Sequence, residues 1–151
     1  CGEWTALAPW QSGEVAEVPG VRRAPEPDDL TRKLWEQFAR GAYRMRGGAG
    51  WHGCEVCEPE KRDPNAWTEV HHVISQRRLK RYAQDNSLPT LRLLELLTDP
   101  RNSIVLCRPH HGNHTVRMNR IPLAKIPDAA WAFARELGLE RELMQEYDRE
   151  Q

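Results

Sequence analysis

The chain has 151 residues, 39% of them hydrophobic and 29% charged, a size that suits one compact domain with a small core and peripheral segments. Its 22 Lys and Arg residues balance its 22 Asp and Glu residues, so the formal net charge is zero. The most apolar stretch, residues 91–97, contains Arg92 and Glu95 and is too short to span a bilayer, which argues against a membrane protein. The first residues lack a basic segment followed by an apolar stretch, so we expect no secretion signal and a cytoplasmic protein.

The N-terminal part is expected to be peripheral. Residues 1–27 are rich in Pro, Gly and Glu and show no apolar period, so we predict a mobile arm. Residues 28–50 are predicted to form a flanking helix, because Asp28 or Asp29 can cap its start and the glycines from Gly47 onward can end it. Apolar residues recur along this helix at helical spacing: Leu30, Leu34, Phe38 and Met45.

Residues 51–120 are predicted to form the core, which opens on a pair of cysteines in a knuckle and loop. β-Branched residues favour a strand over residues 68–75, and a second short strand is expected at 103–106. Between the strands, residues 76–99 are predicted to be a long connection with one short helix near 91–97.

The chain is expected to end in helices. Proline suits a first helical turn, so a helix is predicted to begin around Arg108 and Pro109 and to carry His110, His111 and His114. Residues 121–151 are expected to be a C-terminal helical extension with two helices. One follows Pro127, ends at Gly138 and has an apolar face (Ala130, Phe133, Ala134 and Leu137), and the other is polar and covers 140–147. This order of elements predicts an α+β fold, a small ββα core with flanking helices at both ends.

Three cysteines and a histidine have the spacing of a zinc site. Cys54 and Cys57 form a Cys-x-x-Cys knuckle, and Cys107 and His110 form a second pair at a predicted strand end and helix start. Tetrahedral zinc prefers thiolate and imidazole ligands, and without a secretion signal metal binding is a better interpretation of paired cysteines than disulfides. We therefore predict that these four residues bind a structural Zn²⁺. Two alternatives stay open: cysteines that are only buried apolar residues, and His52 or Cys1 as a substitute ligand.

The helix that carries His110 has two more histidines. His111 and His114 stand three residues apart and share a helix face, whereas His110 points about 100° away from His111. One helix can therefore contribute to two metal sites on different sides.

Two segments together resemble the HNH endonuclease family, over about residues 51–118. They are EVHHVIS, with His71 and His72, and RNSIVLCRPHHGNH, with Asn102, Cys107, His110 and His111. Members of this family have a treble-clef-like ββα-metal core, with the first His on a strand, an Asn in a loop, and the last His on a helix after a second strand. This chain departs from the usual pattern in its Cys-x-x-His second knuckle pair, in its long stretch between the strands, and in a His where Asp is frequent at position 71. The paired histidines resemble those of the colicin-type nucleases.

The resemblance implies a division of roles. His72 is expected to be the general base that takes a proton from the attacking water, and Asn102 is expected to hold the region of His72 in place. His71 and His111, with His114 as a third ligand, are expected to bind a catalytic divalent metal: Mg²⁺, Mn²⁺, Ni²⁺, Co²⁺ or Zn²⁺. Neighbours on a regular strand point to opposite faces, so we predict a bend or bulge that lets both strand histidines face one site.

The middle of the chain is basic although the whole chain is neutral. Residues 70–125 contain ten Lys and Arg residues against three Asp and Glu residues, which favours a polyanionic partner; an ordinary solvated helix face is the alternative. Six basic residues are predicted to contact DNA phosphates in a salt-sensitive, weakly sequence-selective way: Arg77, Arg78, Lys80, Arg81, Arg108 and Arg117.

The sequence therefore predicts a metal-dependent endonuclease that hydrolyses phosphodiester bonds in double-stranded DNA with little choice of sequence. The main alternative is a zinc-stabilised DNA-binding module of the same fold that no longer cuts, and an RNA nuclease or toxin is a third reading. The run from Cys107 to His111 and the trailing helices resemble free-standing HNH proteins of bacteriophages and actinobacteria. That resemblance would place the chain in a bacterial or phage-infected cell, in genome packaging, homing or defence.

Overall fold

A computed structural model describes residues 28–48, 53–63, 65–111 and 121–147. The arm predicted for residues 1–27 lies outside this described part. The elements, in chain order, are α1 (Asp29–Met45), η1 (Pro59–Lys61), β1 (Thr68–His72), α2 (Gln76–Asp85), α3 (Thr90–Thr98), η2 (Pro100–Asn102), β2 (Ser103–Cys107), α4 (Arg108–His111), η3 (Leu123–Lys125), α5 (Asp128–Leu137) and α6 (Glu140–Tyr147). The predicted α+β class is confirmed.

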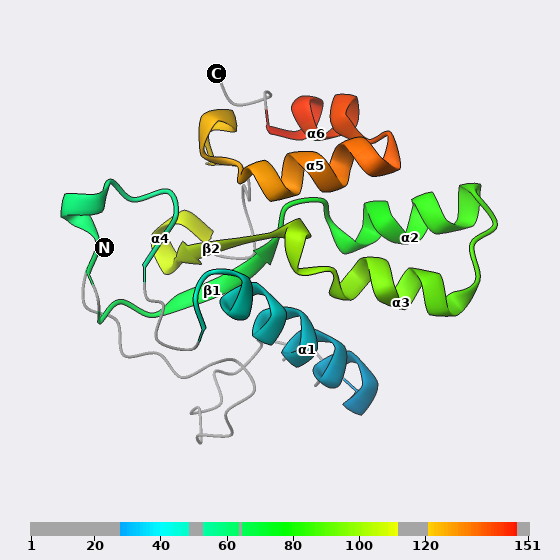
Figure 1. The fold of residues 1–151 in the computed structure, drawn as a ribbon, viewed down its shortest axis with the longest axis horizontal. Coiled ribbons are helices and arrows are strands. Elements are labelled where there is room, and N and C mark those ends of the chain that lie inside the picture. Colours follow the sequence, from blue (N-terminus) through cyan, green and yellow to red (C-terminus); the bar gives the residue numbers. More distant parts are fainter. Residues whose placement is uncertain (1–27, 49–52, 64, 112–120, 148–151) are drawn as a thin grey trace, which may run out of the picture.

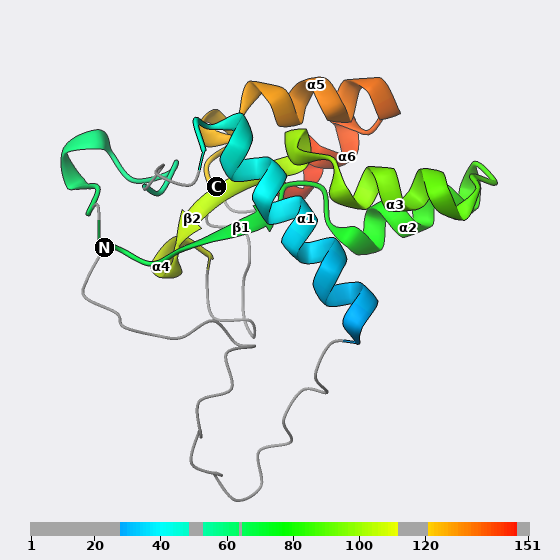
Figure 2. The ribbon, with the colours of Figure 1, turned by 60° about the horizontal axis from the view of Figure 1, so that its bottom comes forward.

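The two strands form an antiparallel hairpin at the centre of the fold, with helices on both faces (Figures 1 and 2). Thr68 pairs with Cys107 at one end of the hairpin, and His72 pairs with Ser103 at the other. The two ends are about 13 Å apart, since a strand rises about 3.3 Å per residue. The sheet thus separates a cysteine-bearing end from a histidine-bearing end.

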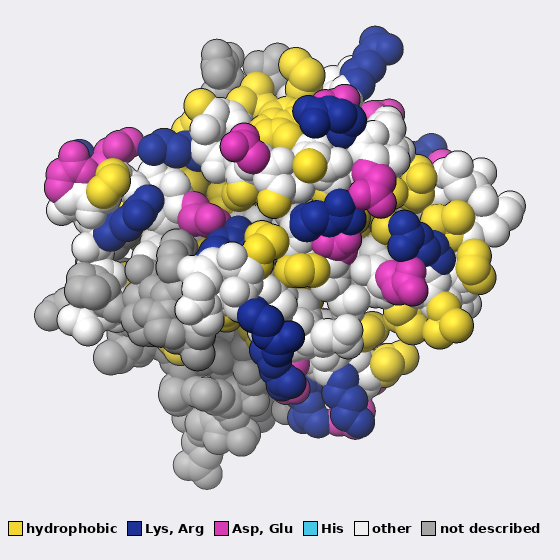
Figure 3. Space-filling view, in the orientation of Figure 1, with side chains coloured by type: hydrophobic (Ala, Val, Ile, Leu, Met, Phe, Trp, Pro, Cys, Tyr) yellow, Lys and Arg dark blue, Asp and Glu magenta, His cyan; other side chains and the backbone are white. Residues whose placement is uncertain are grey.

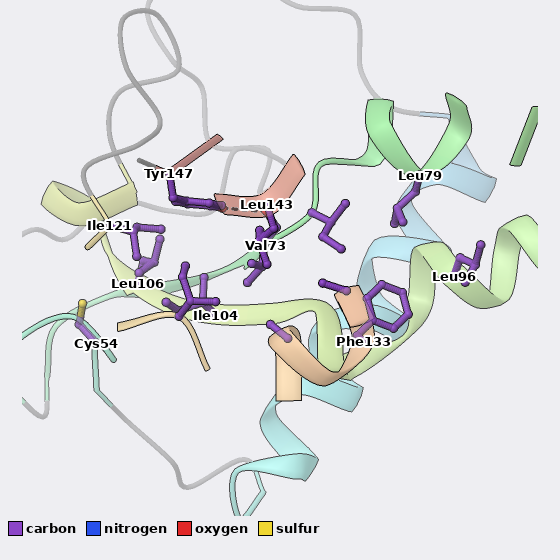
Figure 4. Packing of buried hydrophobic residues seen from close by; sticks show 14 of the residues in the cluster. Cys54, Val73, Leu79, Leu96, Ile104, Leu106, Ile121, Phe133, Leu143 and Tyr147 are labelled. Carbon is purple, nitrogen blue, oxygen red and sulfur yellow. Dashed lines mark hydrogen bonds between the residues drawn. The ribbon is translucent and has the colours of Figure 1, made fainter. Parts of the chain in front are cut away.

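Alternating residues of the hairpin enter two separate clusters of buried side chains. Val70 and Val105 pack against α1 through Phe38, Ala39 and Ala42. On the other face, the larger cluster joins the hairpin to α5, α6 and the cysteines; its strand members include Ile104 and Leu106, and Figure 4 shows part of it. Because both faces are covered, every residue of β2 is buried.

α1 begins where predicted. The side chain of Asp28 accepts a hydrogen bond from the backbone N–H of Thr31 at 2.8 Å, which satisfies a donor at the helix start. The helix buries Phe38, Ala39 and Ala42 on one face and ends at Met45. Leu30 and Met45, which we placed on the apolar face, are instead 61% and 43% exposed.

A nearly buried ion pair joins α1 to the hairpin. The Arg46 guanidinium donates from Nε and Nη2 to the two carboxylate oxygens of Glu55, each at 2.9 Å. It also donates to the hydroxyl and carbonyl oxygens of Ser103, both at 2.9 Å. The side chain of Arg46 is only 8% exposed and that of Glu55 22%, so each charge depends on the other for solvation.

The connection between the strands holds two helices, of which we predicted one. α3 confirms the short helix near 91–97, and α2 packs beside it as the second arm of a helical hairpin (Figure 1). α2 buries only Leu79 and Ala83 and is otherwise polar, so its apolar period was too sparse to reveal it. β1 also ends at His72 rather than at 75, because the backbone after His72 bonds to Asn102 instead of continuing the ladder.

The two C-terminal helices match their predictions. α5 buries Ala130, Phe133 and Ala134, and α6 covers the residues expected of it. Gly138 ends α5 in the left-handed conformation, with φ of 69°, which glycine adopts without the steric cost of a Cβ. Within the described ranges, no helix has both the length and the apolar character needed to cross a membrane.

We expect the Arg46→Ala variant to lower the free energy of unfolding by about 3–5 kcal/mol, because it leaves the partly buried carboxylate of Glu55 without its partner. Urea unfolding at neutral pH measures this change. Arg40→Ala, which removes an exposed arginine of the same helix, is the matched control and should change stability by less than about 0.5 kcal/mol. Equal effects of the two variants would contradict the role assigned to the ion pair.

Candidate metal centre and active site

The four predicted zinc ligands come together at one end of the hairpin. Cys54 and Cys57 come from the turn that precedes η1, Cys107 is the last residue of β2, and His110 lies in α4. Their ligand atoms all lie within 4.8 Å of one another, and the three cysteines are buried. Elsewhere in the described ranges, no other group of three or more Cys, His, Asp or Glu side chains is arranged to hold a metal ion.

The spacing of these atoms fits a tetrahedral ion. Nδ1 of His110 lies 3.2 Å from Sγ of Cys54, 3.5 Å from Sγ of Cys57 and 3.2 Å from Sγ of Cys107. The sulfurs of Cys57 and Cys107 are 3.8 Å apart. Zinc bonds of about 2.3 Å to sulfur and about 2.0 Å to nitrogen would place two sulfurs about 3.8 Å apart and sulfur from nitrogen about 3.5 Å apart. None of the three cysteines forms a disulfide, and the four residues could hold a metal such as zinc.

Burial makes this group of sulfurs dependent on a positive charge. It raises the pKa of the Cys107 thiol to about 12. It also raises the pKa of Cys57, with the neighbouring Cys54 adding to the effect. Burial acts in the same direction on Cys54, but backbone hydrogen bonds from Cys107, Cys57 and Val56 outweigh it, so the pKa of Cys54 is lowered. A cation at the centre is therefore needed for all three cysteines to be thiolates together.

The knuckle is tied to the free edge of β2 by Glu55, which lies between the two cysteines. Its backbone N–H donates to the carbonyl of Val105 at 2.9 Å, and its carboxylate accepts from the N–H of Val105 at 2.7 Å. The same carboxylate receives the Arg46 guanidinium. The roles of Glu55 and Arg46 were not predicted from the sequence, because a glutamate inside a Cys-x-x-Cys turn and an arginine after a helix look like ordinary surface charges.

The predicted general base, His72, lies at the opposite end of the hairpin. Its ring stacks on the ring of Phe38 from α1, with 3.7 Å between centroids and 6° between planes. Its Nε2 lies 2.9 Å from the carbonyl oxygen of Leu97. A carbonyl can only accept, so Nε2 carries the proton and Nδ1 keeps a lone pair. Burial lowers the pKa of His72, although the bond to Leu97 acts in the other direction, so the neutral ring is favoured.

His71 and His72 do not face the same side, and the predicted bend or bulge between them is wrong. The strand register is continuous through both residues, so their side chains alternate. His72 faces α1, whereas His71 lies opposite Ile104, which belongs to the cluster beneath α5 and α6. The strand stays regular here because Val70 and His72 both pack against α1.

Asn102 is fully buried and holds the backbone directly after His72. Its side-chain oxygen accepts from the N–H of Ile74 at 2.7 Å, and its side-chain nitrogen donates to the carbonyl of Ile74 at 2.9 Å. Its own carbonyl accepts from the N–H of Val73 at 3.0 Å. Asn102 therefore fixes the region of His72 through this backbone, while Leu97 and Phe38 hold the ring itself.

A tyrosine from the last helix completes this arrangement. The hydroxyl of Tyr147 donates to the carbonyl of Val73 at 2.7 Å; both residues are labelled in Figure 4. The four backbone polar groups of Val73 and Ile74 are therefore all bonded by Asn102 and Tyr147. Burial raises the pKa of Tyr147, which therefore stays a donor. Sequence reasoning did not find Phe38 or Tyr147 as partners of this region, because both contacts join residues far apart in the chain.

Part of the predicted site lies outside the described residues. His114 and Arg117 belong to residues 112–120, and the side chain of His111 at the end of α4 is also outside the described part. The other predicted DNA contacts divide into two kinds. Arg77, Lys80, Arg81 and Arg108 are exposed, whereas Arg78 is partly buried beside Glu146, with 3.3 Å between Nε and a carboxylate oxygen.

Comparison with known proteins gives one match. Residues 54–117 match a family model described as HNH endonuclease. No curated protein and no solved structure matches the chain. The matched segment contains the knuckle, both strands, α2, α3 and α4, and over this segment the predicted resemblance to the family is confirmed.

The Cys107→Ser variant is expected to lose its bound zinc and several kcal/mol of stability, because metal-binding free energy in such a site becomes folding free energy. Metal analysis of the purified protein, together with thermal unfolding before and after chelation, measures both effects. Cys1→Ser is the control and should keep one zinc per chain. A Cys107→Ser protein that retained stoichiometric zinc and an unchanged Tm would rule out this ligand set.

We expect His72 to make stability fall as the pH is lowered from 7 toward 5. The unfolded state binds a proton near pH 6.5, but the half-buried ring resists it because its folded pKa is lowered, so stability is full above about pH 6.5 and declines below it. The slope from one such group is at most about 1.4 kcal/mol per pH unit. Urea unfolding of wild type and His72→Gln across this range isolates the contribution; parallel curves would show that His72 does not supply it.

Proposed function

We propose that this chain, which carries the HNH endonuclease segment over residues 54–117, hydrolyses phosphodiester bonds in DNA. The observation that carries the proposal is the state of His72 on the hairpin of that segment. Burial lowers its pKa and so favours the neutral ring, one nitrogen is anchored on the carbonyl of Leu97, and the other nitrogen keeps a lone pair. A general base at neutral pH needs these properties.

His72 would act through Nδ1. The proton of a water molecule passes to this nitrogen while the water oxygen bonds to phosphorus, and the bond from phosphorus to the leaving sugar oxygen breaks. The hydrogen bond from Nε2 to Leu97 at 2.9 Å persists during the transfer and orients the imidazolium that forms. The lowered pKa means that the ring is ready to accept a proton rather than already charged.

Three histidines are proposed to hold a catalytic divalent ion: His71, His111 and His114. Their imidazoles suit Mn²⁺, Ni²⁺, Co²⁺ or Zn²⁺, and Mg²⁺ is also proposed as a candidate for the catalytic ion. When bound, such an ion balances the charge that develops on the phosphate and on the leaving oxygen. Of the three, only His71 has a described side chain, and it lies on the face of the hairpin opposite His72, so this part of the proposal depends on the sequence pattern.

The structural zinc site supports the proposal by fixing where α4 begins. Cys107 and His110 flank the start of this helix, and their ligand atoms lie 3.2 Å apart. His111 directly follows His110, so the same site sets the position from which His111 extends. A chain without the knuckle would leave α4, which has only four residues, without an anchor.

The proposed substrate is double-stranded DNA bound with little sequence preference. Arg77, Lys80 and Arg81 lie exposed on α2 and are proposed to contact phosphates, together with Arg108 at the start of α4. The face in Figure 3 shows Lys and Arg side chains interspersed with Asp and Glu rather than gathered in one patch. That pattern supports modest, salt-sensitive binding rather than a deep basic groove on this face.

A second candidate function is a zinc-stabilised DNA-binding module that does not cut. The partial burial of His72 and its separation from the face of His71 favour this candidate, because a general base must reach water and substrate. The family match and the lone pair at Nδ1 of His72 support the nuclease proposal instead.

Plasmid nicking decides between the two. We expect the wild-type protein to nick supercoiled plasmid in the presence of Mg²⁺, Mn²⁺, Ni²⁺, Co²⁺ or Zn²⁺, and His72→Ala to be slower by about 10²–10⁴-fold, the usual contribution of a general base. Arg40→Ala, an exposed α1 variant, is the control and should nick at the wild-type rate.

Two results would contradict the nuclease proposal. If wild type and His72→Ala bind DNA equally and neither nicks it, the binding module is the correct reading. If the wild type cleaves single-stranded RNA but not plasmid, the chain is a phosphodiester hydrolase and the proposal that DNA is its substrate is wrong.

A further inference from the structure

The ring of His72 has one neighbour that comes from outside the family segment. Phe38 lies in α1, whereas the family match begins at Cys54. The two rings are stacked nearly parallel, with 3.7 Å between centroids and 6° between planes. Phe38 is fully buried, so this contact is part of the packed interior rather than a surface encounter.

The stack and the bond to Leu97 restrict different motions of the imidazole. A parallel aromatic face fixes the plane in which the ring lies but allows the ring to turn within it. The hydrogen bond from Nε2 to the carbonyl of Leu97, at 2.9 Å, stops that turning and selects which nitrogen is protonated. If the plane were free, the in-plane bond would lose its alignment, because hydrogen bonds weaken steeply with angle.

Phe38 is itself held firmly. It packs with Ala39 and Ala42 of its own helix and with Val70 and Val105 of the hairpin. Val70 stands two residues before His72, on the same face of the strand. The residue after α1, Arg46, bonds to Ser103 of β2, and the hydroxyl of Tyr43 in α1 lies 3.4 Å from that of Thr68 in β1. The stacking surface is therefore a rigid part of the fold.

We propose that Phe38 is a positioning residue for the nuclease reaction: its ring holds the plane of the His72 imidazole so that Nε2 stays on Leu97 and the unprotonated Nδ1 keeps one fixed direction. This inference rests on the proposed function for its catalytic consequence. Its structural consequence, a single ring orientation and a single tautomer, does not depend on catalysis. α1 thereby becomes part of the active-site framework, although it lies outside the matched segment.

The test compares Phe38→Leu with Phe133→Leu in the zinc-loaded full chain. Both substitutions shorten a fully buried phenylalanine, but Phe133 lies in α5, in the other cluster, and its ring contacts Arg101 instead of His72. NMR of histidine labelled with ¹⁵N reports the tautomer of His72, and the shifts of its ring protons report the aromatic ring stacked on it. Plasmid cleavage reports kcat and KM separately.

In wild type we expect a single Nε2–H tautomer and ring protons shifted upfield by the Phe38 ring. In Phe38→Leu the upfield shift should disappear, the Nδ1–H tautomer should become populated, and kcat should fall about tenfold with KM nearly unchanged, since misorientation of a reacting group costs rate rather than binding. Phe133→Leu should lose stability like its counterpart but keep the wild-type tautomer, ring shifts and kcat.

Two results would overturn the proposal: a Phe38→Leu protein with the wild-type tautomer and ring orientation, or a Phe133→Leu protein that disturbs His72 to the same extent. A wild-type chain that cleaves no nucleic acid would instead contradict the proposed function. The NMR comparison would still decide whether Phe38 orients His72.

Discussion

The fold depends on one cluster of ligand atoms at the cysteine end of the hairpin. Three sulfurs and one imidazole nitrogen lie within 4.8 Å of one another, yet burial opposes the ionisation of most of these thiols. A bound cation would resolve this conflict, because it would stabilise the thiolates that the interior disfavours. It would also crosslink an early turn, the end of β2 and the start of α4, which matters in a chain with a small core.

The other end of the hairpin is held by a set of buried hydrogen bonds. The buried side chain of Asn102 has its hydrogen-bonding groups satisfied, because its amide bonds both the N–H and the carbonyl of Ile74. The N–H of Val73 donates to the backbone carbonyl of Asn102, and the carbonyl of Val73 accepts from the hydroxyl of Tyr147. Buried polar groups are costly unless they are satisfied in this way. The segment after His72 is thus held without a ladder partner, and the ring of His72 lies against α1 with a defined tautomer. The candidate zinc site, which would stabilise the fold, and the proposed general base therefore lie at opposite ends of one short hairpin.

Local patterns in the sequence predicted much of this, and contacts between distant residues account for what they missed. The Cys-x-x-Cys spacing identified residues that come together where they could hold a metal, and the apolar face of α5 with its terminal Gly138 gave that helix its bounds. α2 was missed because only Leu79 and Ala83 mark its buried side. Strand alternation alone places His71 and His72 on opposite faces, and the bulge that was predicted to bring them together came from the family resemblance. The stacking of His72 on Phe38, which keeps the strand regular here, joins residues far apart in the chain and could not be predicted. Asn102 was found as a residue that holds the region of His72, but its partners in the backbone were not.

X-ray absorption at the zinc edge of the purified protein tests the central claim most directly, because it reads the atoms bound to the ion without a mutation. We predict three sulfur neighbours at about 2.3 Å and one nitrogen neighbour at about 2.0 Å, from Cys54, Cys57, Cys107 and His110. A spectrum with nitrogen and oxygen neighbours only, or a protein that binds no zinc at all, would contradict the account.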